Sequence, residues 1–353
     1  MLGISVYLQD LSAAPQKIKQ AAENGFQLIF SSLHIPEGDP ETYFQTLSSL
    51  SALAKSHNMQ LIMDISEKSL HYLKADYRHA KPLTTLGVTG LRIDDGVAAA
   101  DIASLSQQLN VYLNASTITA SFLQELAHYH PRMEAIEAFH NYYPKPGTGL
   151  SKSFFTAKNA FLKEHDLRIS AFIPGDAAKR FPLHEGLPTL EAHRYASPYA
   201  AFLELKSLGI DDVYIGDAEM KTERFYFWKN IRQRELVLPL KLAHPISPQL
   251  ATYLTNGDCD RPDTAADFVR LRNSRSYFQD QLIPPQDSSP VRETGAVTMD
   301  NSLFGRYQGE VMISKKTLPP EPKTNIIGYI DPAFHDCLPY AAQMKKIRFL
   351  LQE

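Results

Sequence analysis

Carboxylates follow several short apolar segments of this chain, each near the point where the segment ends. Six are candidates for acid–base work: Glu37, Asp64, Asp94, Asp176, Glu185 and Asp217. Two facing carboxylates can cleave a glycosidic bond, because one protonates the leaving oxygen while the other acts as nucleophile or base. Asp94 and Asp217 end their segments directly, so we predict them as the catalytic pair, with Glu37 and Glu185 as substitutes. The alternative for each acid is a salt-bridging or capping role.

Amide, aromatic and basic side chains occupy similar positions and suit a sugar phosphate. Asn114 and Asn141 can hydrogen-bond to hydroxyl or acetamido groups, and Tyr143 can stack on a sugar ring. Arg180 follows the seventh segment, where a guanidinium can hold a phosphate through two hydrogen bonds. The other predicted substrate contacts are Asp64, Thr148 and His193. Capping, rim packing and solvation are the alternatives for these residues.

Several reaction classes find no support in the sequence. There is no His-Glu-x-x-His run and no cysteine cluster, so no metal site is expected. There is no Gly-x-Ser-x-Gly elbow, and no Gly-x-Gly-x-x-Gly run follows an apolar segment. We therefore expect no cofactor.

The elements that position these residues form a repeating unit of apolar strand and amphipathic helix. The predicted strands span residues 3–8, 26–30, 61–64, 90–94, 111–114, 134–141, 169–173 and 213–217. Buried strands that alternate with helices indicate a parallel sheet, and eight units predict a closed (β/α)8 TIM barrel, an α/β fold. Chemistry in such barrels lies at the carboxyl ends of the strands, so the polar residues are expected at one mouth.

The chain has 353 residues, more than one barrel needs. The sequence pattern changes toward the carboxyl end. Proline pairs occur there at 284–285 and 319–320, and apolar and polar residues alternate at 296–299, 309–313 and 326–330. We therefore predict a barrel over residues 1–235 and a smaller, mostly β domain over residues 236–353.

Charge and hydropathy limit the partners of this chain. With 36 basic and 39 acidic residues its net charge is −3, which favours neither nucleic acid nor an anionic membrane surface. No apolar run reaches the ~18 residues of a membrane span, and no basic region precedes the first apolar run. We expect a cytoplasmic protein in which Cys259 and Cys337 are free thiols. The sequence leaves open whether the protein forms a homodimer.

The polar motifs together resemble one family, the 6-phospho-N-acetylmuramidase family of bacterial glycoside hydrolases. The barrel motifs that carry the resemblance are Ser31-Ser32-Leu33-His34-Ile35-Pro36-Glu37, Leu91-Arg92-Ile93-Asp94, Leu113-Asn114-Ala115-Ser116-Thr117, Asn141-Tyr142-Tyr143-Pro144, Phe172-Ile173-Pro174-Gly175-Asp176 and Glu185-Gly186-Leu187-Pro188-Thr189. Arg272-Asn273-Ser274-Arg275 and Gly305-Arg306-Tyr307-Gln308-Gly309-Glu310 resemble its C-terminal domain, which implies a cyclophilin-like β fold. Asp95 departs from the pattern, because an aromatic residue is expected after Asp94.

The resemblance implies a cytoplasmic enzyme of cell-wall recycling. Its partner would be a small phosphorylated disaccharide, N-acetylmuramic acid 6-phosphate β-1,4-linked to N-acetylglucosamine, which it would hydrolyse. A further hypothesis is that the β domain closes over the barrel mouth. Arg275, Arg306 or Tyr307 would then lie near the lactyl carboxylate or the phosphate. A dimerisation or stability module is the alternative.

Two other functions stay open. One is a non-catalytic sugar-phosphate binding or regulatory protein, and the other is a glycosidase for a different phosphorylated disaccharide. A Schiff-base aldolase is disfavoured, because no predicted strand ends on lysine.

Overall fold

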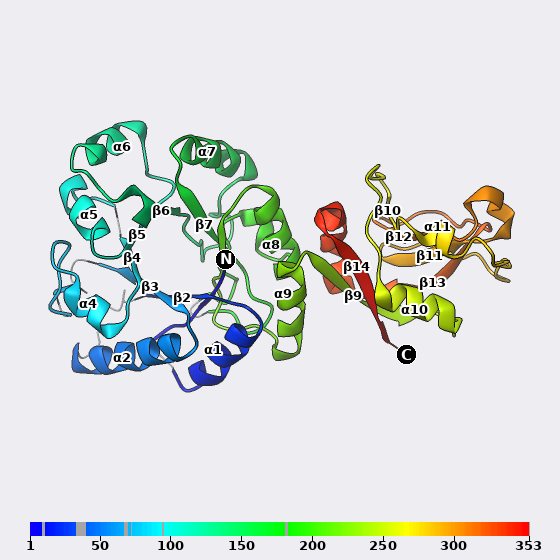
Figure 1. Cartoon of the computed structure of the whole chain (residues 1–353), viewed down its shortest axis with the longest axis horizontal. Helices are drawn as coiled ribbons and strands as arrows, with labels where there is room; N and C mark the ends of the chain where they lie inside the picture. The colour runs from blue at the N-terminus through cyan, green and yellow to red at the C-terminus, as the bar shows by residue number, and fades with distance from the viewer. Residues whose placement is uncertain are drawn as a thin grey trace. The chain divides into compact units, whose positions relative to one another are not determined.

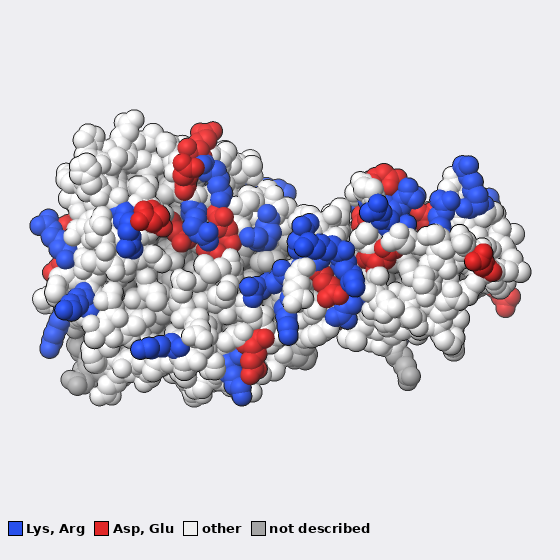
Figure 2. Space-filling view, viewed as in Figure 1, with Lys and Arg blue, Asp and Glu red and all other residues white. Residues whose placement is uncertain are grey.

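The computed structural model describes residues 1–8, 11–32, 40–66, 70–71, 73–93, 95–180 and 183–352, without the side chains of 40–43 and 223. The chain forms two compact units, Met1–Phe225 and Tyr226–Glu353 (Figure 1). Figure 2 shows basic and acidic side chains side by side at several places on the visible face, which agrees with the nearly balanced charge. Cys259 and Cys337 are both free thiols.

The first unit is a closed barrel of eight parallel strands in sequential order, which confirms the predicted (β/α)8 fold. The strands are β1 (Leu2–Ser5), β2 (Leu28–Ser32), β3 (Gln60–Ile65), β4 (Gly90–Ile93), β5 (Asn110–Asn114), β6 (Ile136–Phe139), β7 (Arg168–Ile173) and β8 (Asp212–Ile215). The β1–β8 pairing closes the barrel, with Gly3 opposite Tyr214.

Helices surround the strands in Figure 1. They are α1 (Ala14–Glu23), α2 (Pro40–Ser56), α4 (Lys81–Leu86), α5 (Ala99–Ser106), α6 (Ala120–Ala127), α7 (Lys152–Glu164), α8 (Pro198–Ser207) and α9 (Phe225–Arg232), of which α9 begins at the last residue of the first unit. Ser151 caps α7, because its hydroxyl accepts a hydrogen bond from the Phe154 N–H at 3.3 Å. In α2, the side chains of Leu47, Leu50 and Ala54 are buried at helical spacing.

Large aromatic side chains fill the barrel interior. The central cluster consists of Leu28, Phe30, Ile62, Tyr112, Phe139, Phe172 and Tyr214. The rings of Phe139 and Phe172 are stacked with centroids 4.7 Å apart. Glycine on β1 makes room for these rings, since a Cβ atom on Gly3 would lie 2.3 Å from the Tyr214 ring. The interior is therefore a packed core that supports the mouth above it.

A charged cluster lies at the amino ends of the strands. Arg168 Nη2 is 2.7 Å from Asp212 Oδ2, and Arg168 Nε is 3.5 Å from Glu137 Oε1. The Met1 ammonium group also pairs with Asp212. Burial of Glu137, together with the charge of Asp212, raises the pKa of the Glu137 carboxyl to about 7.

The second unit is built on a six-stranded sheet in the order β10-β12-β11-β13-β9-β14. Its strands are β9 (Glu235–Leu242), β10 (Phe268–Arg270), β11 (Ala296–Asp300), β12 (Val311–Ser314), β13 (Thr324–Ile330) and β14 (Lys346–Gln352). The sequence predicted β11, β12 and β13 and missed the other three. Its helices α10 (Pro248–Asn256) and α11 (Ser274–Tyr277) are short, so the mostly β character of this part is confirmed.

Candidate active site

A buried ion pair forms the polar layer above the aromatic core. Strand register sets Asp64 of β3 opposite Arg92 of β4, and Arg92 Nη1 donates to Asp64 Oδ1 at 2.7 Å. A second guanidinium nitrogen of Arg92 donates to the side-chain oxygen of Asn141, which follows β6. Both Asp64 and Arg92 are less than one tenth exposed. This layer therefore fixes Asp64 and Asn141, two of the predicted substrate contacts, at the carboxyl ends of three strands.

Arg180 is held by two tyrosines at the same end of the barrel. Its guanidinium carbon lies 3.9 Å from the centre of the Tyr7 ring, and Nη1 donates to the Tyr142 hydroxyl at 2.6 Å. The Tyr142 ring packs edge-on against Phe172 of the core, with centroids 5.0 Å apart. Among the described residues, no carboxylate pairs with the Arg180 side chain. Within the described ranges, the site thus presents a fixed cation whose charge is not neutralised by an acidic side chain.

Asp217 is fully buried where the chain leaves β8. Its Oδ2 accepts from the Gly175 N–H at 2.8 Å and lies 3.4 Å from Lys179 Nζ. Its Oδ1 accepts from the Arg180 N–H at 3.4 Å. Asp217 therefore ties the segment after β7, which carries Arg180, to the end of β8.

A pocket of about 210 Å³ opens beside Arg180. Its lining consists of Tyr142, Pro144, Arg180, Leu183, Glu185, Gly186 and Leu187. Glu185 is half-buried, and its Oε2 accepts from the Tyr195 hydroxyl at 2.9 Å. One guanidinium and one carboxylate thus share a small cavity, an arrangement able to bind an anion beside a proton donor or acceptor.

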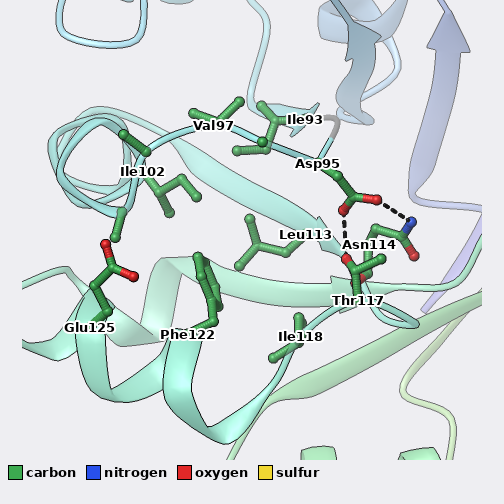
Figure 3. A pocket seen from close by; sticks show the side chains of 13 residues that line it. Ile93, Asp95, Val97, Ile102, Leu113, Asn114, Thr117, Ile118, Phe122 and Glu125 are labelled. Carbon is green, nitrogen blue, oxygen red and sulfur yellow. Dashed lines mark hydrogen bonds between the residues drawn. The ribbon is translucent and has the colours of Figure 1, made fainter.

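Asn114 belongs to a second and larger cavity of about 390 Å³, between the ends of β4 and β5 and helices α5 and α6 (Figure 3). Side chains such as Ile102 and Phe122 make most of its wall apolar. At one end Asp95 accepts a hydrogen bond from the Thr117 hydroxyl at 2.5 Å and a longer one from the Asn114 amide at 3.5 Å. Asn114 is thereby engaged with Asp95, the residue that departs from the family pattern.

The other predicted residues lie in different surroundings. Thr148 is exposed and its hydroxyl donates to the Lys145 carbonyl at 2.6 Å. His193 is buried, and its Nε2 is 2.8 Å from Glu204 of α8. Burial lowers the pKa of His193, although the contact with Glu204 opposes this change. The Asp176 carboxylate accepts a hydrogen bond from the Lys221 N–H at 2.8 Å. Glu37 and Asp94, two of the predicted catalytic acids, fall outside the described residues.

A second buried arginine organises the loops after β6 and β7. Arg194 makes two hydrogen bonds to Glu191, at 2.7 and 2.6 Å, and donates to the carbonyl of Tyr143 at 3.0 Å. Glu191 also accepts from the N–H groups of Gly147 and Gly149 at 2.9 and 2.8 Å. The hydrogen bonds from Arg194 lower the pKa of Glu191 to about 2. Tyr143 is thereby positioned through its backbone.

The sequence predictions gave no role to Arg92, Tyr7 or Arg194 at this end of the barrel. Arg92 carried a signal, because a charged residue inside an apolar strand of a barrel must find a buried partner. Tyr7 and Arg194 carried no comparable signal. In the described part of the chain no group of three or more His, Cys, Asp or Glu residues is arranged to hold a metal ion, and no helix is long and apolar enough to cross a membrane.

These features define a (β/α)8-barrel protein with a charged and aromatic mouth, joined to a smaller β unit. The chain belongs to the 6-phospho-N-acetylmuramidase family: the family's N-terminal model matches residues 2–229, and its C-terminal model matches residues 236–350. No curated protein matches the chain.

Two solved structures are similar to the chain along its whole length. A conserved Enterococcus faecalis protein of unknown function is 34% identical with a TM-score of 0.86, and the match covers 100% of this chain and 96% of that one. An uncharacterised B. cereus protein is 27% identical with a TM-score of 0.78, and the match covers 99% of both chains.

Proposed function

We propose that this protein is a 6-phospho-N-acetylmuramidase of peptidoglycan recycling. It hydrolyses the β-1,4 bond of N-acetylmuramic acid 6-phosphate linked to N-acetylglucosamine and releases the two sugars. The family supports the activity, and a phosphorylated substrate fits a cytoplasmic enzyme. The observation that carries the proposal is the small cavity in which Arg180 and Glu185 lie together.

Arg180 is proposed to bind the 6-phosphate. Its side chain is held by Tyr7 and Tyr142, and it has no carboxylate partner among the described residues. A phosphate dianion would supply the missing negative charge and accept two parallel N–H bonds from the guanidinium. Because both rings fix the guanidinium before binding, less conformational entropy is lost when the phosphate arrives.

Glu185 is proposed as one of the two catalytic carboxylates, and Asp94 stays the prediction for the other. Of the four predicted acids, Glu185 shares the cavity with Arg180, whereas Asp217 directs its oxygens to the segment after β7. We therefore give Asp217 a positioning role. One carboxylic acid protonates the leaving oxygen of N-acetylglucosamine, the other carboxylate acts as nucleophile or base, and water completes the hydrolysis.

The test compares the phosphorylated disaccharide with the same disaccharide lacking phosphate, with products followed by mass spectrometry. The proposal expects cleavage of the phosphorylated form alone. It also expects Glu185→Gln to lower kcat by about 100-fold or more, while Glu134→Gln, an exposed acid before β6, retains activity. Binding without cleavage by the folded protein would favour the binding-protein alternative and overturn the hydrolase.

A further inference from the structure

The second unit contains a cavity of its own, of about 480 Å³. Its lining consists of Arg261, Arg272, Arg275, Ser276, Gln279, Gly305, Arg306 and Gln308. Four of these eight residues are arginines, and none is acidic. The Ser276 hydroxyl donates to the Asn273 carbonyl and the Gln308 amide to the Gln281 carbonyl, so the arginine side chains are the main hydrogen-bond donors of this cavity.

The positive charge of this cavity is only partly neutralised. Arg261 pairs with Asp263, at 2.9 Å from Nε to Oδ1, and lies at 4.0 Å from Glu310. Among the described residues, no acid lies within ion-pair distance of Arg272, Arg275 or Arg306. Three guanidinium groups that line one cavity repel one another, and a bound anion would replace this repulsion with attraction.

Tyr307 holds two of these guanidinium groups in place. The Arg275 and Arg306 guanidinium carbons lie 5.2 and 4.9 Å from the centre of the Tyr307 ring. Arg306 Nη2 also donates to the Tyr307 hydroxyl at 2.9 Å. The two cations are therefore oriented by an aromatic ring without being neutralised.

We propose that this cavity of the second unit is a binding site for a phosphate monoester. Arginine side chains match the planar, two-pronged geometry of a phosphate group. The volume exceeds what a phosphate ion alone requires and falls within the range of small-molecule sites, which favours a sugar phosphate as the occupant. The inference goes beyond the proposed hydrolysis and stands on residues of the second unit alone.

The experiment is isothermal titration calorimetry of the full chain with N-acetylglucosamine 6-phosphate, inorganic phosphate and unphosphorylated N-acetylglucosamine. It is carried out on the wild type and on an Arg180→Gln variant, in which the proposed phosphate contact of the barrel is removed. The site in the second unit should still bind the sugar phosphate in the Arg180→Gln chain. Inorganic phosphate should bind more weakly, and the unphosphorylated sugar should not bind.

Adding Arg272→Gln and Arg306→Gln to the Arg180→Gln chain should weaken this remaining binding by about tenfold or more. The matched control, Lys345→Gln with Lys346→Gln, removes the same charge at exposed positions of the second unit and should leave the affinity unchanged. Thermal unfolding without ligand checks that each variant is folded. The site is refuted if the Arg180→Gln chain binds neither anion, or if its affinity survives the two arginine replacements. Absence of cleavage by the folded wild type, with this binding intact, would instead count against the proposed function and leave the site in the second unit standing.

Discussion

The guanidinium carbon of Arg180 lies over the Tyr7 ring, 3.9 Å from the ring centre. Tyr7 follows β1 and Arg180 follows β7, and β8 lies between these two strands in the closed sheet. The Tyr7 hydroxyl donates to the Gly216 carbonyl at 2.6 Å, which anchors the ring to the end of β8. Tyr7 is therefore a positioning residue for the cation in the candidate active site.

Replacing Tyr7 with leucine should raise KM for the phosphorylated disaccharide by about 3- to 30-fold, the range expected for a partly buried cation–π contact. Tyr7→Phe keeps the ring and should stay close to the wild type in KM. Steady-state kinetics on both variants separates the two contributions. An unchanged KM in Tyr7→Leu would show that the ring does not position Arg180.

Arg180→Lys should reduce kcat/KM for the phosphorylated disaccharide by about tenfold, because lysine retains the charge but loses the planar pair of donors. Arg180→Gln, which removes the charge as well, should reduce it further. The exposed Arg78, which pairs with Asp101 at 2.7 Å on the outside of the barrel, is the matched control as Arg78→Gln. Equal losses in Arg78→Gln and Arg180→Gln would contradict a specific phosphate contact.

Much of the fold was predictable because its signals are local. Each barrel strand is a short, mostly apolar run, and a run of this kind can be identified without knowing which strands lie beside it. In the second unit β9 contains Pro239, which argues against an inner strand, and β14 has Lys346 and Arg348 among its apolar residues. These two strands pair with each other across more than 100 residues of sequence, a long-range relation that local patterns do not contain.

The candidate site was less predictable, because what a polar residue does depends on its contacts. Asp217 and Glu185 look alike in the sequence as acids after strands, yet one is fully buried in hydrogen bonds and the other lines a cavity. His193 follows a polar loop but makes its side-chain contact with Glu204. Only tertiary structure distinguishes these cases.

Gly3→Ala should destabilise the barrel by about 1–3 kcal/mol, since an added Cβ atom would lie 2.3 Å from the Tyr214 ring. Urea unfolding measures the change. Combining Gly3→Ala with Tyr214→Leu should cost less than the sum of the two single replacements, because the smaller side chain removes the overlap. Strict additivity would refute a direct contact.

Arg92→Met should destabilise the protein by about 3–5 kcal/mol, because it removes the positive charge that is paired with the buried Asp64 carboxylate. Asp64→Asn with Arg92→Met removes both charges and should recover part of this loss. Urea unfolding of the two single variants and the double variant completes a double-mutant cycle. If the loss of unfolding free energy in the double variant equals the sum of the losses in the two single variants, the two residues are not energetically coupled.

Glu137 should make the protein less stable as the pH rises from about 4.5 to about 7. The pKa of Glu137 is raised in the folded state from 4.5 to about 7, so the folded state binds more protons than the unfolded state within this window. The stabilisation by Glu137 is therefore fully present below the pKa of its carboxyl in the unfolded state, and it is lost as the pH rises through the pKa in the folded state. The loss is on the order of 3 kcal/mol at most. Urea unfolding at pH 5, 6, 7 and 8 should show the decline in the wild type.

Glu137→Gln should flatten this pH profile, because the amide resembles the protonated carboxyl and does not titrate. Arg168 keeps an ionic partner in this variant, since it remains 2.7 Å from Asp212. Glu134→Gln is the control, because Glu134 is exposed and its pairing with Arg132 is long at 3.9 Å. A profile equally steep in the wild type and in Glu137→Gln would show that another group governs the pH dependence.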